Sequence, residues 1–412
     1  MTATVIAVFV VVYLGMVLGG LPFVQLDRTG IALLGAIALI GLDALPLEEA
    51  ARAIHLPTLI LLFAFMVVSA QMRLGGFYDR VTAKLVALAL PPAQLLGVLM
   101  LVIAALSAVF SNDIVCLAVA PVLIDACRER RLDPVPFLLG LACAANIGSA
   151  ATLIGNPQNM LIGQKLQLSF AGYIAAAWLP VVLGLAASWA LIAWPIRGGD
   201  VLVDSTTAAA SSERRADAVP FDGWQTVKGL AVVGVLLVVF LFTSWPREQA
   251  ALVGAGVLLM SRKLHSRKML GLVDWELLIL FIGLFVVNHA LQLTPVLPRV
   301  VSELGALGFD LDRPGTLFVT TFALSNVVSN VPAVMLLLPF AGQPGAGPLL
   351  ALVSTLSGNL LIVGSIANII VVDAAARRNV RISWRRHAAI GVPVTLVTLA
   401  ITAACLWPRF GV

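Results

Sequence analysis

The chain has 412 residues, of which 60% are hydrophobic and only 11% are charged, and its mean hydropathy is +1.02. A soluble globular chain carries about 25% charged residues, so this composition excludes an ordinary soluble domain and predicts a protein embedded in a lipid bilayer. The net charge of +5 does not indicate a nucleic-acid partner, because the basic residues lie in separate loops between apolar runs. The four cysteines have no metal-ligand spacing, which excludes a structural zinc site and a disulfide framework.

The apolar runs are long enough for helices and lack the alternation of a membrane β-barrel, so we predict an all-α polytopic membrane protein. The five predicted spans of residues 1–196 are 3–21, 29–42, 57–72, 137–162 and 173–194. The stretch 73–90 mixes charged with apolar residues and predicts a helix that lies in the membrane interface.

Residues 93–127 form an apolar run that is too short for two full spans of about 20 residues each. They therefore predict a re-entrant hairpin that turns at 111–113. A polar segment, 197–226, follows the last span and predicts a flexible linker between two halves.

The second half, 227–412, predicts the same series of elements. Its five spans are 228–244, 249–261, 275–292, 348–372 and 388–406, and its hairpin covers about 315–340. The sequence itself also repeats: Ser107-Ala-Val-Phe-Ser-Asn-Asp113 returns 218 residues later as Ser325-Asn-Val-Val-Ser-Asn-Val331. Gly155 and Asn159 return as Gly364 and Asn368 at an offset of 209. A duplicated half of this length is typical of transporters.

Five spans per half is an odd number, so the second half should enter the membrane from the opposite side and form an inverted repeat. The distribution of basic residues supports this topology, because 20 of the 26 Lys and Arg residues then lie on the cytoplasmic side. The prediction places both termini outside the cytoplasm and the linker inside it.

Placing a polar residue inside a membrane is energetically unfavourable, so the polar residues within the apolar runs are candidates for a binding site. Dense glycine, asparagine and proline at 146–159 and 357–368 predict helices that are broken at mid-membrane, where freed backbone can line a cavity. The candidates in the first half are Ser107, Ser111, Asn112, Asp113, Asn146, Gly148, Ser149, Thr152, Gly155, Asn156 and Asn159. Those in the second half are Ser325, Ser329, Asn330, Ser357, Gly358, Asn359, Gly364, Ser365 and Asn368.

These residue types leave two kinds of solute open. Hydroxyl, amide and carbonyl oxygens suit a hard cation such as Na⁺, whereas amide and backbone N–H groups at helix starts suit an anion. Asp113 is an acid within an apolar run and is a candidate proton carrier or counter-charge. The chain offers no constellation of catalytic acid, histidine and nucleophile, so an enzyme is not predicted.

The twice-occurring Ser-Asn and the stretch Asn146–Asn159 resemble the ion transporter superfamily. That group includes the divalent anion/sodium symporters, the ArsB arsenite pumps, the citrate permeases and the NhaD-type antiporters, and the resemblance is greatest to bacterial anion permeases. It implies an elevator transporter of the inner membrane, in which elements at about 93–165 and 313–372 move against a scaffold that is usually a homodimer. No cofactor is implied beyond Na⁺ or H⁺ as coupling ion.

By the same resemblance, two Na⁺ sites are implied, one in each half. The first comprises Ser107, Ser111, Asn112 and Gly155, and the second comprises Ser325, Ser329, Asn330 and Gly364. The third residue of each tip departs from the threonine of the symporters, being Asp113 and Val331. We therefore expect a secondary active transporter of a small anion or oxyanion; the alternatives are arsenite or antimonite efflux by proton antiport, or Na⁺/H⁺ antiport.

Overall fold

The computed structural model describes residues 1–20, 25–196 and 220–410, and within these ranges the chain is helical with no strand. The helices of the first half are α1 (Thr2–Leu18), α2 (Arg28–Gly41), α3 (Leu47–Ala53), α4 (Leu56–Leu74), α5 (Phe77–Val86), α6 (Pro92–Ser107), α7 (Asn112–Glu129), α8 (Pro134–Ser149), α9 (Pro157–Lys165) and α10 (Phe170–Ile196). Those of the second half are α11 (Gly223–Phe242), α12 (Arg247–Leu259), α13 (Ser266–Leu270), α14 (Trp275–Gln292), α15 (Val296–Ala306), α16 (Pro314–Val328), α17 (Asn330–Leu337), α18 (Ala346–Ser357), α19 (Ile366–Arg377) and α20 (Trp384–Leu406).

The two halves present their helices in the same order. Each half begins with two helices, a short helix and a longer helix, continues with one further helix and two interrupted pairs, and ends with a long helix. Prolines begin α6, α8, α9 and α16, where their fixed φ suits the first turn and their missing N–H has no partner to lose. The starts of these four helices are thus encoded locally.

Some predicted boundaries differ from the structure. The turn between α6 and α7 occupies 108–111, so Asn112 and Asp113 begin α7 instead of lying in the turn. Helix α11 begins at Gly223, within the segment assigned to the linker, and the rest of that linker, 197–219, lies outside the described residues. Asp222 causes the early start, because its side chain accepts hydrogen bonds from the N–H groups of Trp224 and Gln225 and caps the helix.

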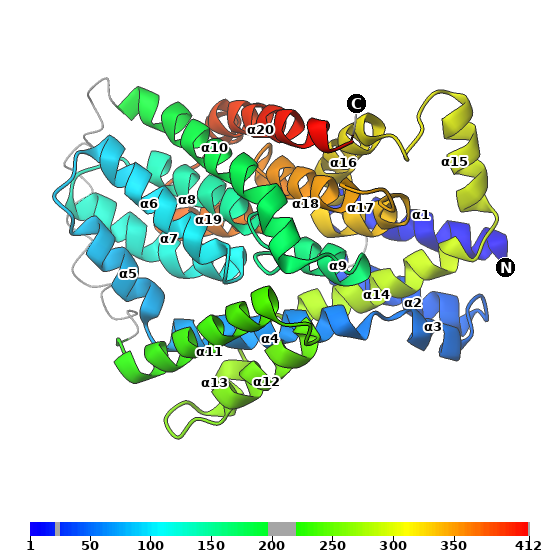
Figure 1. Ribbon diagram of the computed structural model, residues 1–412, viewed down its shortest axis with the longest axis horizontal. Coiled ribbons are helices and arrows are strands. Elements are labelled where there is room, and N and C mark those ends of the chain that lie inside the picture. Colours follow the sequence, from blue (N-terminus) through cyan, green and yellow to red (C-terminus); the bar gives the residue numbers. More distant parts are fainter. Residues whose placement is uncertain (21–24, 197–219, 411–412) are drawn as a thin grey trace.

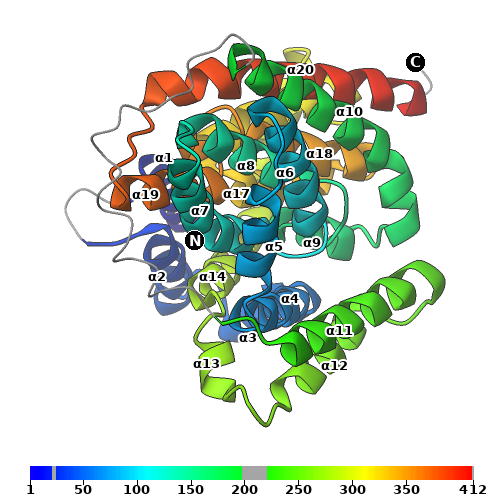
Figure 2. The same cartoon turned by 90° about the vertical axis from the view of Figure 1, so that its left-hand side faces the viewer.

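The helices pack into two groups (Figures 1 and 2). The first group, which we call the frame helices, contains α1, α2, α4, α11, α12 and α14, with α4 against α12 and α2 against α14. The second, which we call the site helices, contains α6 to α10 and α16 to α20. Helices α10 and α20 lie side by side, and the start of α10 reaches α11, where the ring centroids of Phe170 and Phe240 are 5.5 Å apart.

The resemblance implies that 173–194 and 388–406 are scaffold spans. In the structure the corresponding helices α10 and α20 pack on α6, α8 and α18. Their long apolar sequences carry no local sign of this partner. One contact of the pair is at Gly184, where a Cβ atom would lie 3.2 Å from Cγ2 of Thr398. Close approach of the two helices at a small residue is typical of membrane helix packing.

Five helical segments of the described residues are long and apolar enough to cross a membrane: Leu56–Leu74, Phe170–Ile196, Gly223–Phe242, Trp275–Gln292 and Trp384–Phe410. The other predicted spans correspond to shorter helices, α1, α2 and α12, or to the broken pairs α8–α9 and α18–α19. Helices α10 and α11 also expose large apolar side chains, including Trp178, Val182, Val235 and Phe242. Such surfaces suit contact with lipid.

Candidate functional site

Both predicted helix interruptions are present. Helix α8 ends at Ser149 and α9 begins at Pro157, while α18 ends at Ser357 and α19 begins at Ile366. Each interruption is held by an asparagine of the following helix. Asn159 donates from Nδ2 to the carbonyls of Ser149 (3.4 Å) and Thr152 (3.0 Å).

Asn368 repeats this arrangement at the offset of 209. Its Nδ2 donates to the carbonyls of Gly358 (2.8 Å) and Leu361 (3.0 Å), which are the equivalents of Ser149 and Thr152. Carbonyls released by a helix break need a donor, because buried backbone groups without partners are destabilising. The repeated asparagines therefore stabilise the two breaks in the same way.

Asn146 lies at the centre of the site, 2% exposed. Its Oδ1 accepts from Asn112 Nδ2 (3.2 Å) and from Ser365 Oγ (2.9 Å). Its Nδ2 donates to Asn359 Oδ1 (2.9 Å) and to Asn368 Oδ1 (3.3 Å). All four hydrogen-bonding positions of the amide are used, so one side chain joins the first tip to the break of the other half.

Thr355 is the counterpart of Asn146 at the offset of 209. Its hydroxyl accepts from Asn156 Nδ2 (3.2 Å) and donates to Asn159 Oδ1 (3.3 Å). Asn146 likewise accepts from Ser365 and donates to Asn368, the equivalents of Asn156 and Asn159. These two pairs of contacts between the halves are therefore equivalent in partners and in direction.

The break of the first half also touches the segment between α6 and α7. The backbone N–H of Asn112 donates to the carbonyl of Gly155 (3.3 Å). A Cβ atom on Gly155 would lie 2.3 Å from the carbonyl oxygen of Ser149 and 2.7 Å from that of Ser107. Only glycine leaves room for these two oxygens to approach the backbone so closely.

The second half has the corresponding segment at Ser329, the one residue between α16 and α17. Ser329 has φ 77° and ψ 160°, a conformation that side chains other than glycine adopt rarely and at a cost of about 1–3 kcal/mol. Asn330, which follows it, approaches the second break: a Cβ atom on Gly358 would lie 3.3 Å from Asn330 Nδ2. Ser111, the counterpart of Ser329, has an ordinary φ of −55°.

Several buried oxygens of these segments have no hydrogen-bond partner in the described chain. They are Ser107 Oγ and Asn112 Oδ1 in the first half, and Ser325 Oγ, Asn326 Oδ1 and Asn330 Oδ1 in the second half. Ser107 corresponds to Ser325 and Asn112 to Asn330 at the offset of 218. An amide oxygen can only accept, so its burial without a donor is unfavourable unless a bound molecule or ion supplies a donor or a positive charge.

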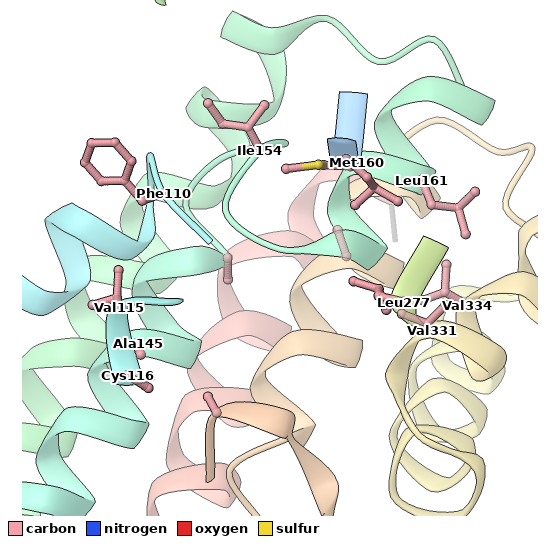
Figure 3. Close-up of a cluster of buried hydrophobic side chains, with 14 of the residues drawn as sticks. Phe110, Val115, Cys116, Ala145, Ile154, Met160, Leu161, Leu277, Val331 and Val334 are labelled. Atoms are coloured by element: carbon pink, nitrogen blue, oxygen red, sulfur yellow. The ribbon is translucent and has the colours of Figure 1, made fainter. Parts of the chain in front are cut away.

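The helices that carry these oxygens, α7 and α17, also bury apolar side chains, as does α9 of the first break. Figure 3 shows Val115 and Cys116 of α7 on one side, Val331 and Val334 of α17 on the other, and Met160 of α9 between them in this view. All five side chains are at most 9% exposed. A low local dielectric strengthens any interaction of the unpaired oxygens with a charge.

Most of the predicted residues lie at the two breaks or the two tips. Ser149 Oγ donates to the Asn146 carbonyl and accepts from Asn156 Nδ2, and Thr152 Oγ1 donates to the carbonyl of Ala108. Gly364 lies beside the carbonyl of Gly358 and Oδ1 of Asn326. Ser111, Asp113 and Ser329 are half-buried at the tips.

Two predicted residues have contacts of a structural kind. Ser357 donates to the carbonyl of Val353 in its own helix (2.6 Å). Gly148 packs against the backbone of α6, since a Cβ atom there would lie 2.3 Å from the carbonyl oxygen of Ala104. The Ser357 hydroxyl therefore stabilises its own helix, and the small size of Gly148 allows α6 and α8 to pack closely. Neither contact involves the unpaired oxygens.

Thr355, Gln158 and Asn326 are further residues of the site that were not predicted from the sequence. Gln158 Nε2 donates to Thr355 Oγ1 (3.3 Å), and Asn326 contributes an unpaired oxygen. The signal for Thr355 was available, because it is the residue that the offset of 209 pairs with Asn146. Asn326 lies inside the repeated motif, but the offset of 218 aligns it with an alanine, Ala108, so the repeat did not indicate it.

Comparison with known proteins identifies the family of the chain. Residues 6–356 match the model of the citrate transporter family, CitMHS. The inner membrane protein YbiR of Escherichia coli is 31% identical over 335 residues, which cover 81% of this chain and 83% of YbiR. The silicon efflux transporter LSI3 of Oryza sativa is 29% identical, with 92% of each chain covered.

Among solved structures, the YdaH transporter of Alcanivorax borkumensis aligns over 100% of this chain and 98% of its own, with a TM-score of 0.56 and 14% identity, so the two share a fold. The helical fold and the interrupted helices around buried amides are those of a membrane transport protein. This chain belongs to the citrate transporter family. The resemblance to the ion transporter superfamily drawn from its Ser-Asn repeats is confirmed.

Proposed function

We propose that the protein is a secondary active transporter that couples the movement of a small anion or oxyanion to Na⁺. The observation that carries the proposal is the matched set of buried, unpaired oxygens at Ser107 and Asn112 in one half and at Ser325 and Asn330 in the other. Hydroxyl and amide oxygens are the donors that a hard cation prefers. Two equivalent cation sites, one per half, follow from the repeat.

The anion would bind beside these cations, at the starts of the half-helices. Helices α7 and α17 begin at the tips, at Asn112 and Asn330, and α9 and α19 begin at the breaks. The N-terminus of a helix presents free N–H groups and partial positive charge. Citrate and other carboxylates are the first class to test, given the family model, and small oxyanions are the second, given the similarity to a silicon efflux transporter.

The topology that we propose is two inverted halves, each with five spans and one re-entrant hairpin, in a bacterial inner membrane. The reciprocal contacts of Asn146 and Thr355 support a two-fold relation between the halves. The basic loops support cytoplasmic placement of the linker and periplasmic termini. We further propose that the site helices, which include α10 and α20, move as an elevator against the frame helices. Two copies of the chain would associate through their frame helices.

The test is a thermal-shift experiment on the purified chain with NaCl or choline chloride, each with and without citrate, phosphate or arsenite. A solute that binds the folded state raises the melting temperature, by an amount equivalent to about 2.7 kcal/mol at a concentration of 100 Kd. We expect Na⁺ to raise it, and the anion to raise it further only with Na⁺ present. Equal responses to sodium and choline would contradict Na⁺ coupling.

Variants connect the response to the site. Asn112→Ala and Asn330→Ala should each reduce the Na⁺-dependent shift, because each removes an unpaired oxygen. Ser357→Ala is the matched control, because the Ser357 hydroxyl bonds within its own helix. Uptake of the stabilising anion into proteoliposomes with an inward Na⁺ gradient then distinguishes a transporter from a binding protein.

Proton-driven efflux of arsenite or antimonite is the second candidate, and Asp113 is the feature that favours it. The carboxyl stands half-buried in the first turn of α7, directly after Asn112, where a negative charge is favoured by the helix dipole. If protons drive transport, Asp113→Asn should abolish the pH-driven component and leave folding intact. Uptake that keeps the pH dependence of the wild type between pH 6 and 8 in this variant would remove Asp113 from the mechanism.

A further inference from the structure

His387 contacts the second helix break from behind. It lies in the first turn of α20, is 3% exposed, and has Nε2 3.2 Å from the carbonyl oxygen of Asn359. A carbonyl only accepts, so this nitrogen carries the proton and donates. Nδ1 is buried without a hydrogen-bond partner in the described chain.

Helix α20 approaches this break as closely as a backbone allows. Gly391 stands one turn after His387, and a Cβ atom there would lie 2.4 Å from the Asn359 carbonyl oxygen and 3.1 Å from that of Leu360. The contact is therefore fixed on two sides, by the glycine backbone and by the imidazole. Any change at His387 is transmitted to Asn359, whose Oδ1 accepts from Asn146.

The first half has the same contact with a different side chain. Tyr173 of α10, 2% exposed, donates its hydroxyl to the carbonyl of Ala150 (2.7 Å) and accepts from Asn159 Nδ2 (3.1 Å). Ala150 and Asn359 are equivalent at the offset of 209. In each half, then, the last helix supplies a donor to the carbonyl at the start of the break.

The two donors differ in how they respond to pH. A phenol keeps its proton throughout the physiological range, whereas an imidazole gains or loses a proton near neutrality. Proton uptake at Nδ1 would add a positive charge next to the second half of the site and none next to the first. Two like charges in a poorly hydrated interior repel strongly, so a proton on His387 opposes a cation at Ser325, Asn326 and Asn330.

Few other ionisable groups face His387. Among the helices packed against α20, α10 carries Tyr173, α8 carries Cys143 and α18 carries none. Arg385 and Arg386 lie on α20 itself, where Arg386 pairs with Asp133 at the start of α8. Arg409 belongs to the turn at the opposite end of α20.

We propose that His387 is a positioning residue that makes cation binding in the second half of the site dependent on pH, while Tyr173 holds the first half independently of pH. This inference rests on the proposed Na⁺-coupled function. It predicts that protons and Na⁺ bind antagonistically, and that only the Na⁺ affinity of the second half of the site changes with pH.

The experiment is a Na⁺ titration of the purified full-length chain at about pH 5.5, 6.5 and 7.5, with the melting temperature as the measured quantity. In the wild type, the Na⁺ concentration for half-maximal stabilisation should rise about tenfold from the highest pH to the lowest. His387→Gln keeps an N–H donor that does not titrate, so this concentration should become nearly constant. His387→Tyr, which installs the side chain of the first half, is the second non-titrating variant should His387→Gln fold poorly.

Two further variants complete the design. His387→Phe removes the donor and should weaken Na⁺ binding at every pH, whereas Tyr173→Phe should leave the pH dependence of the wild type in place. Wild-type pH dependence that persists in His387→Gln would overturn this inference alone, as would equal Na⁺ affinity of the Gln and Phe variants. Absence of any Na⁺ response in the wild type at all three pH values would overturn the proposed function together with it.

Discussion

At the scale of single residues, the site is built from amides and hydroxyls that both donate and accept hydrogen bonds. Asn146 accepts from Asn112 and Ser365 and donates to Asn359 and Asn368. Aspartate could replace only the accepting half of this pattern, and a serine could not span it. The asparagine therefore specifies the relative placement of three chain segments.

We expect Asn146→Ala to destabilise the protein by about 3 kcal/mol, because several buried partners lose their hydrogen bonds at about 1–3 kcal/mol for each unsatisfied group. The measurement is the melting temperature of the purified chain in detergent. Ser357→Ala, in the opposite break, removes a bond within one helix and should change it little. Equal effects of the two substitutions would contradict the central role of Asn146.

The backbone strain at Ser329 predicts the opposite direction of change. Ser329→Gly should raise stability by about 1 kcal/mol, because glycine adopts φ 77° without a steric penalty. Ser111→Gly should lower stability, since that backbone is unstrained at φ −55° and glycine gains only conformational entropy in the unfolded chain. Thermal unfolding of the pair decides, and a stabilising Ser111→Gly together with a destabilising Ser329→Gly would refute the strain.

The sequence predicted part of this residue-scale detail. The offset of 218 paired Asn112 with Asn330 and the offset of 209 paired Asn159 with Asn368, and the structure gives both members of the second pair the same contacts. Thr355 was not predicted although the offset of 209 pairs it with Asn146, and His387 was not predicted because a histidine in an apolar helix looks ordinary until the three-dimensional contacts are known. Ser357 shows the converse, since its polarity is satisfied within its own helix.

At the scale of elements, each break lets a helix start inside the protein. Helices α9 and α19 begin with Asn156 and Ser365 as N-terminal caps, and Asn156 Oδ1 accepts from the N–H of Asn159 (2.9 Å). Position 155, between the two half-helices, has room only for glycine, because the carbonyls of Ser149 and Ser107 lie close to it.

Gly155→Ala should consequently disrupt the first break. Its Cβ atom would meet two backbone oxygens at 2.3 and 2.7 Å, and backbone atoms cannot move aside as a side chain can. We expect loss of the Na⁺-dependent thermal shift and a lower melting temperature. Gly163→Ala, which meets only Leu153 side-chain atoms at 3.1 Å, is the control in the helix that follows the break, α9, and should keep the shift.

A second element-scale prediction concerns His55, the residue before α4. Burial, together with the charge of Lys165 at the end of α9, lowers the pKa of His55 to about 4, and Glu248 opposes the shift in part. The folded chain then binds fewer protons than the unfolded chain between about pH 6.5 and 4. Stability should therefore fall as the pH falls through that window.

His55→Gln removes the titrating group, so its melting temperature should decline less than that of the wild type between pH 6.5 and 4.5. The effect is modest, because His55 is only half-buried and solvent screens its charge. His265→Gln is a suitable control, since His265 is exposed and caps the short helix α13. Parallel pH curves for the wild type and His55→Gln would show that His55 does not contribute.

At the scale of the whole molecule, two helix groups meet along few contacts while each is well packed internally (Figures 1 and 2). At one end of the site helices, ion pairs join the halves: Arg378 lies 3.5 Å from Asp125, and Arg386 pairs with Asp133. These pairs tie α19 and α20 to α7 and α8. The site helices are in this way connected across the two halves as one body.

The proposed orientation predicts that the end with these ion pairs faces the cytoplasm. Reporter fusions test it: alkaline phosphatase joined to the C-terminus should be active in the periplasm, whereas a fusion at the loop between α7 and α8 should be inactive. A cysteine-accessibility scan of the same positions gives an independent measurement. Active reporters at both positions would contradict the inverted arrangement.

The sequence by itself determined that the protein is helical and membrane-embedded, that its halves repeat, and where its helices break, because composition, repeat offset and proline or glycine density are local properties. Tertiary structure alone decided that Asn146 and Thr355 exchange equivalent contacts between halves, that α10 and α20 pack on the site helices, and that Tyr173 and His387 hold the breaks. Those features depend on contacts between residues up to a few hundred positions apart. Their energies come from burial and hydrogen-bond geometry in the folded chain, which no local pattern encodes.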